Sequence, residues 1–469
     1  MYEITPLLDH EKEEPLYIQL YQYIKGEIQS GRLDAGVKLP SKRKLSQHLA
    51  ISQNTVENAY GQLLAEGYIR SEPRKGLYVN ELEGDLYSDH NDSFVKSERV
   101  VEKHDEEEMI DFSHGKVALA HFPYAVWRKL STQALYEEES SLFLNGNPQG
   151  EPELRQEIAQ YVFQSRGVRC EAEQIVIGAG TQYLIGLLTM IMGDGAIYAL
   201  ENPGFHRTRA VLRDRGFQPV PLSLDEDGVS LKDLEESGAN VVYVTPSHQF
   251  PLGMIMPISR RIELLKWAEK QPGYIIEDDY DGEFRYKGRP IPSLHGLGSA
   301  GRVIYLGTFS KSLIPSLRIS YLVLPPVLLE IYQKSFTIYK QTVSRLHQHT
   351  LAKFMENSYW SRHLNKMRGI YRKKQKTLLT AIEEYMGEQV QIIGEKSGLH
   401  ILLHVNNQMS EAELIEAARE KRVKVYPASI YYEESTKHVP SMVLLGFGGV
   451  SEEDIKEGIS RLAHVWIRN

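Results

Sequence analysis

Cysteine is nearly absent from this 469-residue chain, whose single thiol is Cys170. One thiol cannot form a disulfide within the chain, and it offers no cluster of metal-binding sulfurs, so we expect a reducing compartment and no metal. No apolar run approaches the roughly eighteen residues that a membrane-spanning helix needs. The acidic N-terminal segment lacks the apolar centre of a signal peptide. These absences predict a cytoplasmic protein with no membrane association.

Positive charge is also scarce, since the net charge is −8, which by itself argues against nucleic-acid binding. The charge is unevenly distributed, however. Residues 16–79 hold nine Lys or Arg against five Asp or Glu, a local +4, which leaves −12 for the rest. The length indicates two or three domains. The asymmetry predicts a small nucleic-acid-binding module attached to an acidic body.

Helical periodicity dominates the N-terminal module. Apolar residues at helical spacing predict an amphipathic helix over 15–30, and Ser41 predicts the start of a second helix over 42–49. Ser52 caps a third helix after a tight turn at residues 50–51. The residues that we expect on its buried stripe are Val56, Tyr60, Leu63 and Leu64. Two short helices joined by a brief turn have helix-turn-helix geometry.

The exposed side chains of this module predict contacts with DNA. Gln53 and Asn54 can read adenine edges, and Thr55 can reach a phosphate or a thymine methyl group. Two short strands, 68–70 and 76–79, flank a turn that carries Arg74 and Lys75, which forms a wing placed to touch phosphate or a minor groove. The alternative is a generic three-helix module with a solvated polar face.

Residues 16–79 also resemble the winged helix of GntR-type bacterial regulators. The residues that carry this resemblance are Leu16-Tyr17, Leu39 to Leu45, Ser52 to Val56, Leu64 to Tyr68 and Lys75-Gly76. The resemblance implies binding to double-stranded DNA, with Arg43 and residues 53–55 in contact with it. We therefore expect a DNA-binding domain over 1–80. The acidic segment that follows, 81–109, has few apolar residues and predicts a flexible linker.

Apolar runs alternate with helical patterns from residue 110 to about 325, which predicts a mainly parallel sheet covered by helices. The expected strands are Gln174–Ile177, Ala196–Leu200, Val241–Val244, Tyr274–Glu277, Val303–Leu306 and Ile319–Leu324. In open α/β sheets, ligands bind beyond the carboxyl ends of the strands. The residues that follow each strand are therefore the candidate site.

Lys311 lies in a loop rich in hydroxyl groups between two of these strands. Its amine can form a Schiff base with an aldehyde cofactor. Thr308, Ser310 and Arg318 can hold a phosphate. Pyridoxal phosphate carries both an aldehyde and a phosphate group. An ordinary surface lysine is the alternative, because Ser-Lys alone is a frequent sequence.

Other strand ends supply groups that suit the same cofactor. A glycine turn at Gly180 opens a helix and presents N–H groups to an anion, and Thr181 adds a hydroxyl. Phe205 can stack on a flat ring, and Arg207 can bind the carboxylate of an effector. Asp278 can pair with a protonated pyridine nitrogen. The four acids in residues 277–281 leave a divalent metal site as an alternative.

Residues 110–469 resemble the fold-type I aminotransferases. The matching residues are Gly180-Thr181-Gln182, Glu201 to Phe205, Asp278, Tyr280, Thr308 to Lys311 and Arg318. The resemblance implies Lys311 as the Schiff-base lysine, Asp278 on the pyridine nitrogen, Tyr280 on the ring's 3-oxygen and Phe205 stacked on the ring. It implies a homodimer and a small C-terminal subdomain over about 327–469. Together with the winged helix, the chain resembles the MocR/GabR-type subfamily of GntR regulators.

Two departures from the aminotransferase pattern bear on activity. Phe250 stands where these enzymes carry an asparagine that contacts the cofactor, and Leu444 stands where an arginine clamps the substrate carboxylate. Poor orientation of the substrate predicts poor transamination. We therefore expect a regulator that senses an amine, an amino acid or pyridoxal phosphate itself. The alternative is a working aminotransferase with an accessory DNA module. The basic stretch 362–376 indicates a solvated helix face or a second DNA contact.

Overall fold

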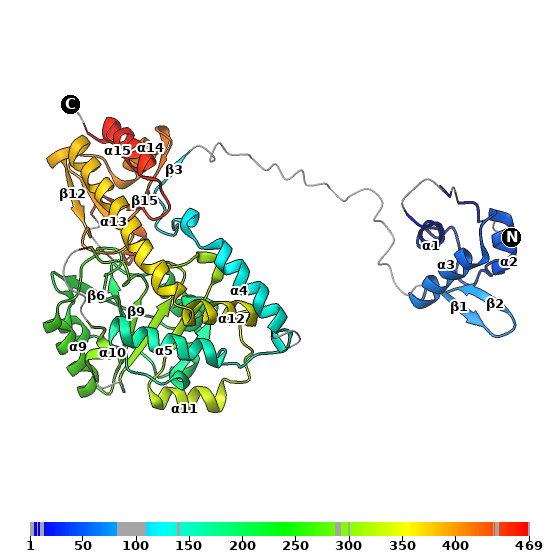
Figure 1. Ribbon diagram of the computed structural model, residues 1–469, viewed down its shortest axis with the longest axis horizontal. Coiled ribbons are helices and arrows are strands. Elements are labelled where there is room, and N and C mark those ends of the chain that lie inside the picture. The colour runs from blue at the N-terminus through cyan, green and yellow to red at the C-terminus, as the bar shows by residue number, and fades with distance from the viewer. Residues whose placement is uncertain are drawn as a thin grey trace. The chain divides into compact units, whose positions relative to one another are not determined.

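A computed structural model describes residues 4–6, 8–9, 14–81, 109–137, 141–286, 292–298, 301–434, 436 and 440–467. The chain divides into two compact units, residues 1–104 and 105–469. Figure 1 shows both units. Almost all of the predicted linker, 82–108, lies outside the described residues. The domain boundaries that we expect from the sequence remain predictions. No helix among the described residues is long and apolar enough to cross a membrane.

The N-terminal unit is a winged helix. Its elements are α1 (Leu16–Gln29), α2 (Lys42–Leu49), α3 (Gln53–Ala65), β1 (Ile69–Glu72) and β2 (Gly76–Val79). The side chains of Ser41 and Ser52 accept hydrogen bonds from the N–H groups of Lys44 and Thr55, so both serines cap helices as expected. The two strands pair antiparallel, with Ile69 opposite Val79. They join the helices around one apolar core.

One side chain of α3 differs from the prediction. Leu64, which the periodicity placed on the buried stripe, is 37% exposed. Ala59 is fully buried in its place. Ala59, Val56 and Leu63 follow the spacing of three and four residues that keeps side chains on one face of a helix, whereas Leu64 is turned about a quarter of a turn away.

The larger unit is built on an eight-stranded sheet with the order β4-β11-β10-β9-β8-β5-β6-β7. The strands are β4 (Ile175–Gly178), β5 (Tyr198–Asn202), β6 (Val220–Asp225), β7 (Gly228–Val229), β8 (Val241–Val244), β9 (Tyr274–Asp279), β10 (Val303–Thr308) and β11 (Ser320–Val323). Six strands run in one direction, and β7 and β11 run against it. The sheet is therefore mainly parallel, as predicted.

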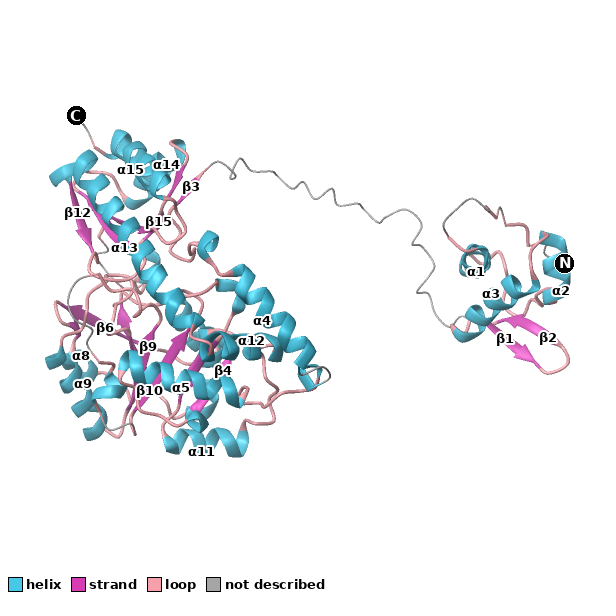
Figure 2. Ribbon diagram, in the orientation of Figure 1, coloured by secondary structure: helices cyan, strands magenta, loops and turns pink. Residues whose placement is uncertain are grey.

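Helices enclose this sheet (Figure 2). They are α4 (Tyr124–Glu137), α5 (Pro152–Arg166), α6 (Thr181–Met192), α7 (His206–Asp214), α8 (Leu231–Glu236), α9 (Ile258–Lys270), α10 (Leu294–Leu297), α11 (Pro326–Ser335) and α12 (Arg345–Glu356). Side chains from α5 and α12 pack with β4 and β11 in one core, and side chains from α6 and α11 pack with the sheet in another. Both α11 and α12 therefore belong to the cores of the large sheet.

A smaller antiparallel sheet forms the C-terminal subdomain. It has the order β12-β13-β16-β15, and a separate parallel pair joins β14 to β3. The elements are β3 (Ile110–Asp111), β12 (Val390–Ile393), β13 (His400–Val405), β14 (Val423–Lys424), β15 (Tyr426–Pro427), β16 (Met442–Gly446), α14 (Glu411–Glu420) and α15 (Glu452–Trp466). The helix α13 (Tyr359–Met386) runs from α12 into this subdomain (Figure 1).

Candidate functional site

The register of the large sheet brings the predicted site residues to one edge. Thr308 at the end of β10 lies opposite Ser320 at the start of β11, and Ser320 lies opposite Gly178 at the end of β4. On the other side of β10, Leu306 pairs with Asp278 near the end of β9. The loops that carry Lys311 and Arg318 and the turn at Gly180 therefore converge beyond this edge.

Lys311 is held at the centre of this edge. Its ammonium group donates a hydrogen bond to the backbone oxygen of His114. Burial lowers the pKa of Lys311 to about 8, while the Asp281 carboxylate raises it and Arg207 lowers it further. A neutral amine is the nucleophilic form of lysine, so this environment favours reaction with a carbonyl group.

Asp278 is buried, with 4% of its surface exposed. One carboxylate oxygen accepts a hydrogen bond from the Tyr243 hydroxyl, and the other, Oδ1, has no partner among the described residues. Burial raises the pKa of Asp278 to about 7. A buried acceptor without a partner is costly, and a cationic N–H donor at Oδ1 would satisfy it.

In the predicted phosphate region, Gly180 lies close to the side chain of Arg318. Gly180 has a φ of +97°, and a Cβ there would clash with the Arg318 guanidinium. Arg318 donates to the backbone oxygen of Ala179 at 3.3 Å. Because L side chains rarely adopt this φ, the position favours glycine, and a side chain there would also displace the Arg318 guanidinium.

Hydroxyl groups line the same edge. Ser320 donates to the Thr308 hydroxyl at 2.9 Å, and the Ser310 N–H donates to the same oxygen at 3.2 Å. Thr181 is the first residue of α6 and is half-buried, whereas Gln182 is exposed. The Gln182 side chain makes no hydrogen bond within the described part of the chain.

Aromatic rings pack together next to His114, whose backbone oxygen accepts the hydrogen bond from Lys311. Phe205 lies parallel to Phe250, with the ring centroids 4.2 Å apart. Tyr280 meets the Phe205 ring at a right angle at 5.0 Å, and Tyr431 meets the Phe250 ring in the same way at 4.7 Å. The stack with Phe250 leaves only one face of the Phe205 ring for another flat group.

The hydroxyl of Tyr280 contacts the buried residue His248. It donates to the backbone oxygen of His248 at 3.1 Å and lies 2.9 Å from His248 Nδ1. The same nitrogen lies 2.9 Å from a carboxylate oxygen of Asp281. His400 adds a third group, since the nearest ligand atoms of His248, Asp281 and His400 lie within 4.8 Å of one another. His400 Nε2 donates to the backbone oxygen of Pro251 at 3.0 Å.

The four acids of residues 277–281 take separate partners. Glu277 accepts hydrogen bonds from two backbone N–H groups at the start of α10, and Asp279 forms an ion pair with Arg166 at 2.6 Å. Asp278 and Asp281 bond to Tyr243 and His248. The four carboxylates therefore do not converge on one point, as a shared metal ion would require.

Arg207, the predicted effector-binding residue, lies exposed in the first turn of α7. Its guanidinium makes no hydrogen bond or ion pair with the described residues. Its charge lowers the pKa values of Lys311 and of His114. An unpaired cation beside Lys311 can attract an anionic group on an effector.

The predicted DNA contacts lie on the surface of the winged helix. Arg43, Gln53 and Asn54 are exposed, and Arg74 and Lys75 are exposed in the turn of the wing. Thr55 is half-buried, and its hydroxyl lies 2.9 Å from that of Ser52 in the helix cap. The DNA roles of these residues remain predictions.

The basic stretch 362–376 is only partly a solvated face. His363 and Lys374 are buried in α13. His363 Nε2 donates to the backbone oxygen of Ser312 at 2.8 Å, and Lys374 donates to that of Gly448 at 3.0 Å. The other basic side chains of this stretch are exposed.

Several residues of the site carried no local signal in the sequence. Tyr243 lies inside a predicted strand, and only its partner Asp278, 35 residues later, gives it a role. His114 contributes a backbone oxygen, which any residue type could supply. His248 and Asp281 could have been noticed because they are chemically reactive residues that flank strand ends.

Two family models match this chain. The model described as "Bacterial regulatory proteins, gntR family" matches residues 16–79. The model described as "Aminotransferase class I and II" matches residues 107–462, which is more than half of the chain.

Whole-length relatives agree with both matches, and a solved structure agrees with the aminotransferase match. The HTH-type transcriptional regulator YdeL of Bacillus subtilis is 47% identical, and the alignment covers 99% of each chain. The probable rhizopine catabolism regulatory protein MocR of Rhizobium meliloti is 33% identical, over 98% of this chain and 96% of the relative. The crystal structure of the Pyrococcus horikoshii kynurenine aminotransferase in complex with PMP has a TM-score of 0.68 and 26% identity, covering 78% of this chain and 93% of its own.

Proposed function

Because this chain belongs to the MocR/GabR-type subfamily of GntR regulatory proteins, we propose that its aminotransferase-like domain binds pyridoxal phosphate and responds to a small molecule. The protein is a transcriptional regulator with a DNA-binding winged helix. We propose an amine or an amino acid as the effector, with pyridoxal phosphate itself as the other candidate. The cytoplasm is the proposed location.

The unpartnered oxygen of Asp278 carries the cofactor proposal. Its neighbours fit the same group: Lys311 supplies an amine with a lowered pKa, and the Gly180–Arg318 approach with the Thr308 and Ser310 hydroxyls supplies donors for a phosphate. When bound, pyridoxal phosphate supplies an aldehyde that reacts reversibly with amines. Tyr280 and Phe205 would contact its ring, and Gln182 would lie near the phosphate.

Regulation is favoured over turnover by the side chains around Lys311. Phe250 is buried and has no polar atom to direct at a cofactor or a substrate. Leu444 is fully buried in the same aromatic and aliphatic cluster. Arg207 is the cation proposed to attract an effector carboxylate. One exposed cation without a second clamp supports binding better than the fixed orientation that proton transfer needs.

We also propose a homodimer. Tyr136, Phe143, Leu144 and Ile338 are each at least 67% exposed. Large apolar side chains left in water favour covering by a partner. Sedimentation of the pure protein should give a dimer mass, and Phe143→Asp should lower that mass toward the monomer. An unchanged mass would place the interface elsewhere, and a monomeric wild type would remove the proposal.

DNA binding by the full-length protein tests the regulator. Fluorescence anisotropy with the gene's own upstream DNA and a scrambled duplex, at about 0.15 M salt, should show a preference of at least tenfold for the upstream DNA. Adding pyridoxal phosphate, or an amine on top of it, should change that affinity. Lys311→Ala should abolish the change, whereas the exposed-residue control Lys334→Ala should keep it.

The outcomes separate the parts of the proposal. Equal affinity for both duplexes would overturn sequence-specific regulation. Specific binding that ignores every added molecule would overturn the sensor. A response to pyridoxal phosphate that amines do not alter would identify the cofactor as the effector.

A further inference from the structure

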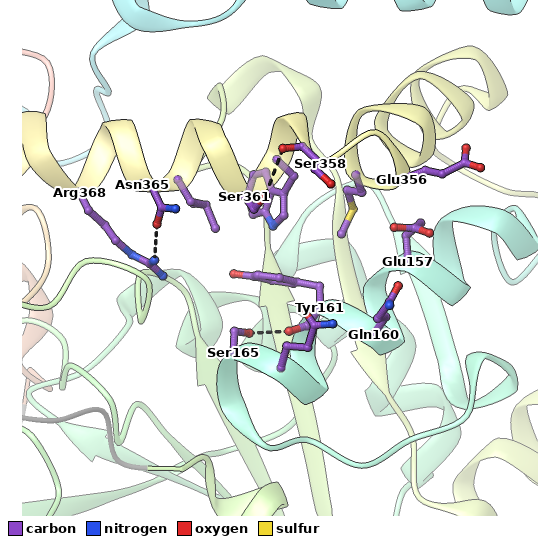
Figure 3. Close-up of a pocket in the computed structure, with 13 residues that line it drawn as sticks. Glu157, Gln160, Tyr161, Ser165, Glu356, Ser358, Ser361, Asn365 and Arg368 are labelled. Atoms are coloured by element: carbon purple, nitrogen blue, oxygen red, sulfur yellow. Dashed lines mark hydrogen bonds between the residues drawn. The ribbon is translucent and has the colours of Figure 1, made fainter.

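A cavity that Lys311 does not line lies between α5, the end of α12 and the first turns of α13 (Figure 3). Its volume is about 520 Å³. This is within the range of roughly 300–1,000 Å³ that is usual for small-molecule sites. Glu157, Gln160 and Tyr161 line it from α5, and Ser361, Asn365 and Arg368 line it from α13. We call it the α5–α13 pocket.

Opposite charges lie at opposite ends of the pocket. Figure 3 shows Glu157 and Glu356 at one end, Arg368 and Asn365 at the other, and Tyr161 between them. Glu157 is half-buried and has no ion-pair partner among the described residues. Burial and the nearby Glu356 carboxylate raise the pKa of Glu157, so the two acids repel each other. Glu356 already pairs with Lys353 at 3.0 Å, so a cation at this end would mainly relieve Glu157.

The opposite end offers donors to an anion. Arg368 donates to the backbone oxygen of Glu283 at 3.0 Å and to the side chain of Asn365 at 3.1 Å, and it has no carboxylate partner in the described chain. Two donors to neutral oxygens orient the guanidinium and leave its positive charge unneutralised. A carboxylate would find both a fixed orientation and a charge here.

A buried donor without a partner also lines the pocket. Trp360 is 4% exposed, and its indole N–H bonds to no described atom. Buried indole N–H groups usually have a partner, because an unmade hydrogen bond is costly. Tyr161 packs edge to face against the Trp360 ring, with the centroids 5.4 Å apart. The two rings give the pocket an aromatic wall that can also receive an ammonium group.

We propose that the α5–α13 pocket binds a second small molecule, a zwitterion of the amino acid or dipeptide class. Its ammonium group would lie between Glu157 and Glu356, and its carboxylate would lie at Arg368 with the Trp360 N–H as a further donor. The binding of this ligand needs neither pyridoxal phosphate nor DNA.

The walls of the pocket connect it to the Lys311 loop. Trp360 packs edge to face on Phe309, two residues before Lys311, with the centroids 5.2 Å apart. One turn further along α13, His363 donates to the backbone oxygen of Ser312. The Tyr161 hydroxyl donates to Glu283, two residues after Asp281, at 2.8 Å. A ligand held between α5 and α13 would therefore bias the loops that position Lys311 and Asp281.

The helix α13 also joins the two cores of this unit. Trp360 and Leu364 are buried in a core of the large sheet, and Met367 and Tyr371 are buried in the core of the small sheet. The pocket lies beside the part of α13 where the helix passes from one core to the other. Occupancy would thus change how freely the small subdomain shifts against the large one, which is a route for coupling two sites.

Calorimetric titration of the full-length protein with the free amino acids and a set of dipeptides tests this site. Putrescine and succinate serve as probes that carry only one sign of charge. We expect saturable binding of at least one zwitterion and weaker binding of both single-sign probes. The titration is repeated with Lys311→Ala, in which the binding should remain.

Charge variants assign the binding to the pocket. Glu157→Gln and Arg368→Gln should each weaken it at least tenfold, whereas the controls Glu153→Gln and Arg372→Gln, exposed on the same two helices, should leave it unchanged. Equal effects of pocket and control variants, loss of all binding in Lys311→Ala, or no saturable binding of any zwitterion would each overturn the proposal. The Lys311→Ala titration separates this failure from a failure of the cofactor proposal.

Discussion

Lys311 and the charges around it illustrate how one side chain acquires its chemistry from distant parts of the chain. Its amine is buried by the large domain, hydrogen-bonded to His114 and placed between the opposing influences of Asp281 and Arg207. Burial disfavours the charged form and lowers the pKa, whereas Asp281 stabilises that form. The balance places half-ionisation near pH 8, where an amine is both available and nucleophilic.

The first prediction concerns the pH dependence of cofactor capture. The rate at which the cofactor-free protein gains the visible absorbance of bound pyridoxal phosphate should rise with pH and level off above about 8, because neutral Lys311 is the reactive form. Asp281→Asn removes the charge that raises this pKa, so the midpoint should fall. Arg207→Gln removes a charge that lowers it, so the midpoint should rise.

Stopped-flow mixing at a series of pH values measures these midpoints. Arg213→Gln on the same helix is the control, since Arg213 is not among the charges that perturb Lys311. Shifts of Asp281→Asn and Arg207→Gln in the same direction would contradict the electrostatic account. A midpoint near the ordinary pKa of a lysine side chain would show that burial does not lower the pKa of Lys311.

A second prediction at this scale concerns Gly180. Gly180→Ala places a methyl group against the Arg318 guanidinium and forces an L side chain to a φ of +97°. Backbone strain of this kind costs about 1–3 kcal/mol. We expect a lower melting temperature and at least tenfold weaker binding of pyridoxal phosphate, measured by absorbance titration. The control Gly195→Ala, which meets nothing within 4 Å, should keep wild-type affinity.

At the scale of elements, the positions of most strands and the mainly parallel character of the sheet were predictable, whereas the reversed direction of β11 was not. An apolar run such as 241–244 favours a buried strand because it is short and consists of valine and tyrosine, which are frequent in strands. The direction of β11 depends on a short return through the loop after Lys311, and its partner β4 lies about 140 residues earlier in the chain. Periodicity within a segment contains no information about such a pairing.

The third prediction concerns α3 of the winged helix. Asn54 is exposed in the first turn of α3, where helix-turn-helix proteins contact bases. Asn54→Ala should cost about 1–3 kcal/mol of binding to the upstream DNA and much less to scrambled DNA. Arg74→Ala should weaken both and lower the salt slope by about 1.

Anisotropy titrations over a range of salt distinguish these two effects. Gln62→Ala, near the far end of the same helix, is the control and should change neither quantity. If Asn54→Ala weakened both duplexes equally, the residue would contact the DNA backbone and not a base.

The candidate site was predictable where a residue type has one dominant use. Lys311 follows β10, Asp278 lies near the end of β9 and Arg318 precedes β11, and the sheet register brings these segments to one edge. The pair of His248 and Asp281 depends on a fold that joins residues 33 apart. The α5–α13 pocket is harder still, because Glu157 and Arg368 are ordinary helix-surface residues until packing aligns α5 with α13.

At the scale of the whole molecule, each function has its own structural unit. The winged helix has a separate apolar core, and the aminotransferase-like unit has cores that share α13. A regulator of this construction needs a site that holds an effector long enough to shift an equilibrium, because a ligand acts only through its different affinities for two states. Rapid conversion of the effector would work against that requirement.

The last prediction follows from this requirement. Phe250 and Leu444 belong to one buried apolar cluster, and Arg207 is the one effector-facing cation that we propose beside Lys311. The substrate is therefore held at one point, and the orientation that lowers the barrier to proton transfer is missing. We expect keto-acid formation from any amino acid at well below about 1 per second, a low rate for an enzyme. A coupled dehydrogenase assay with the cofactor-loaded protein measures it, and Lys311→Ala gives the background. Faster turnover would make transamination a second function of this regulator. The change in DNA affinity would then have to follow the formation of product and not the binding of the effector.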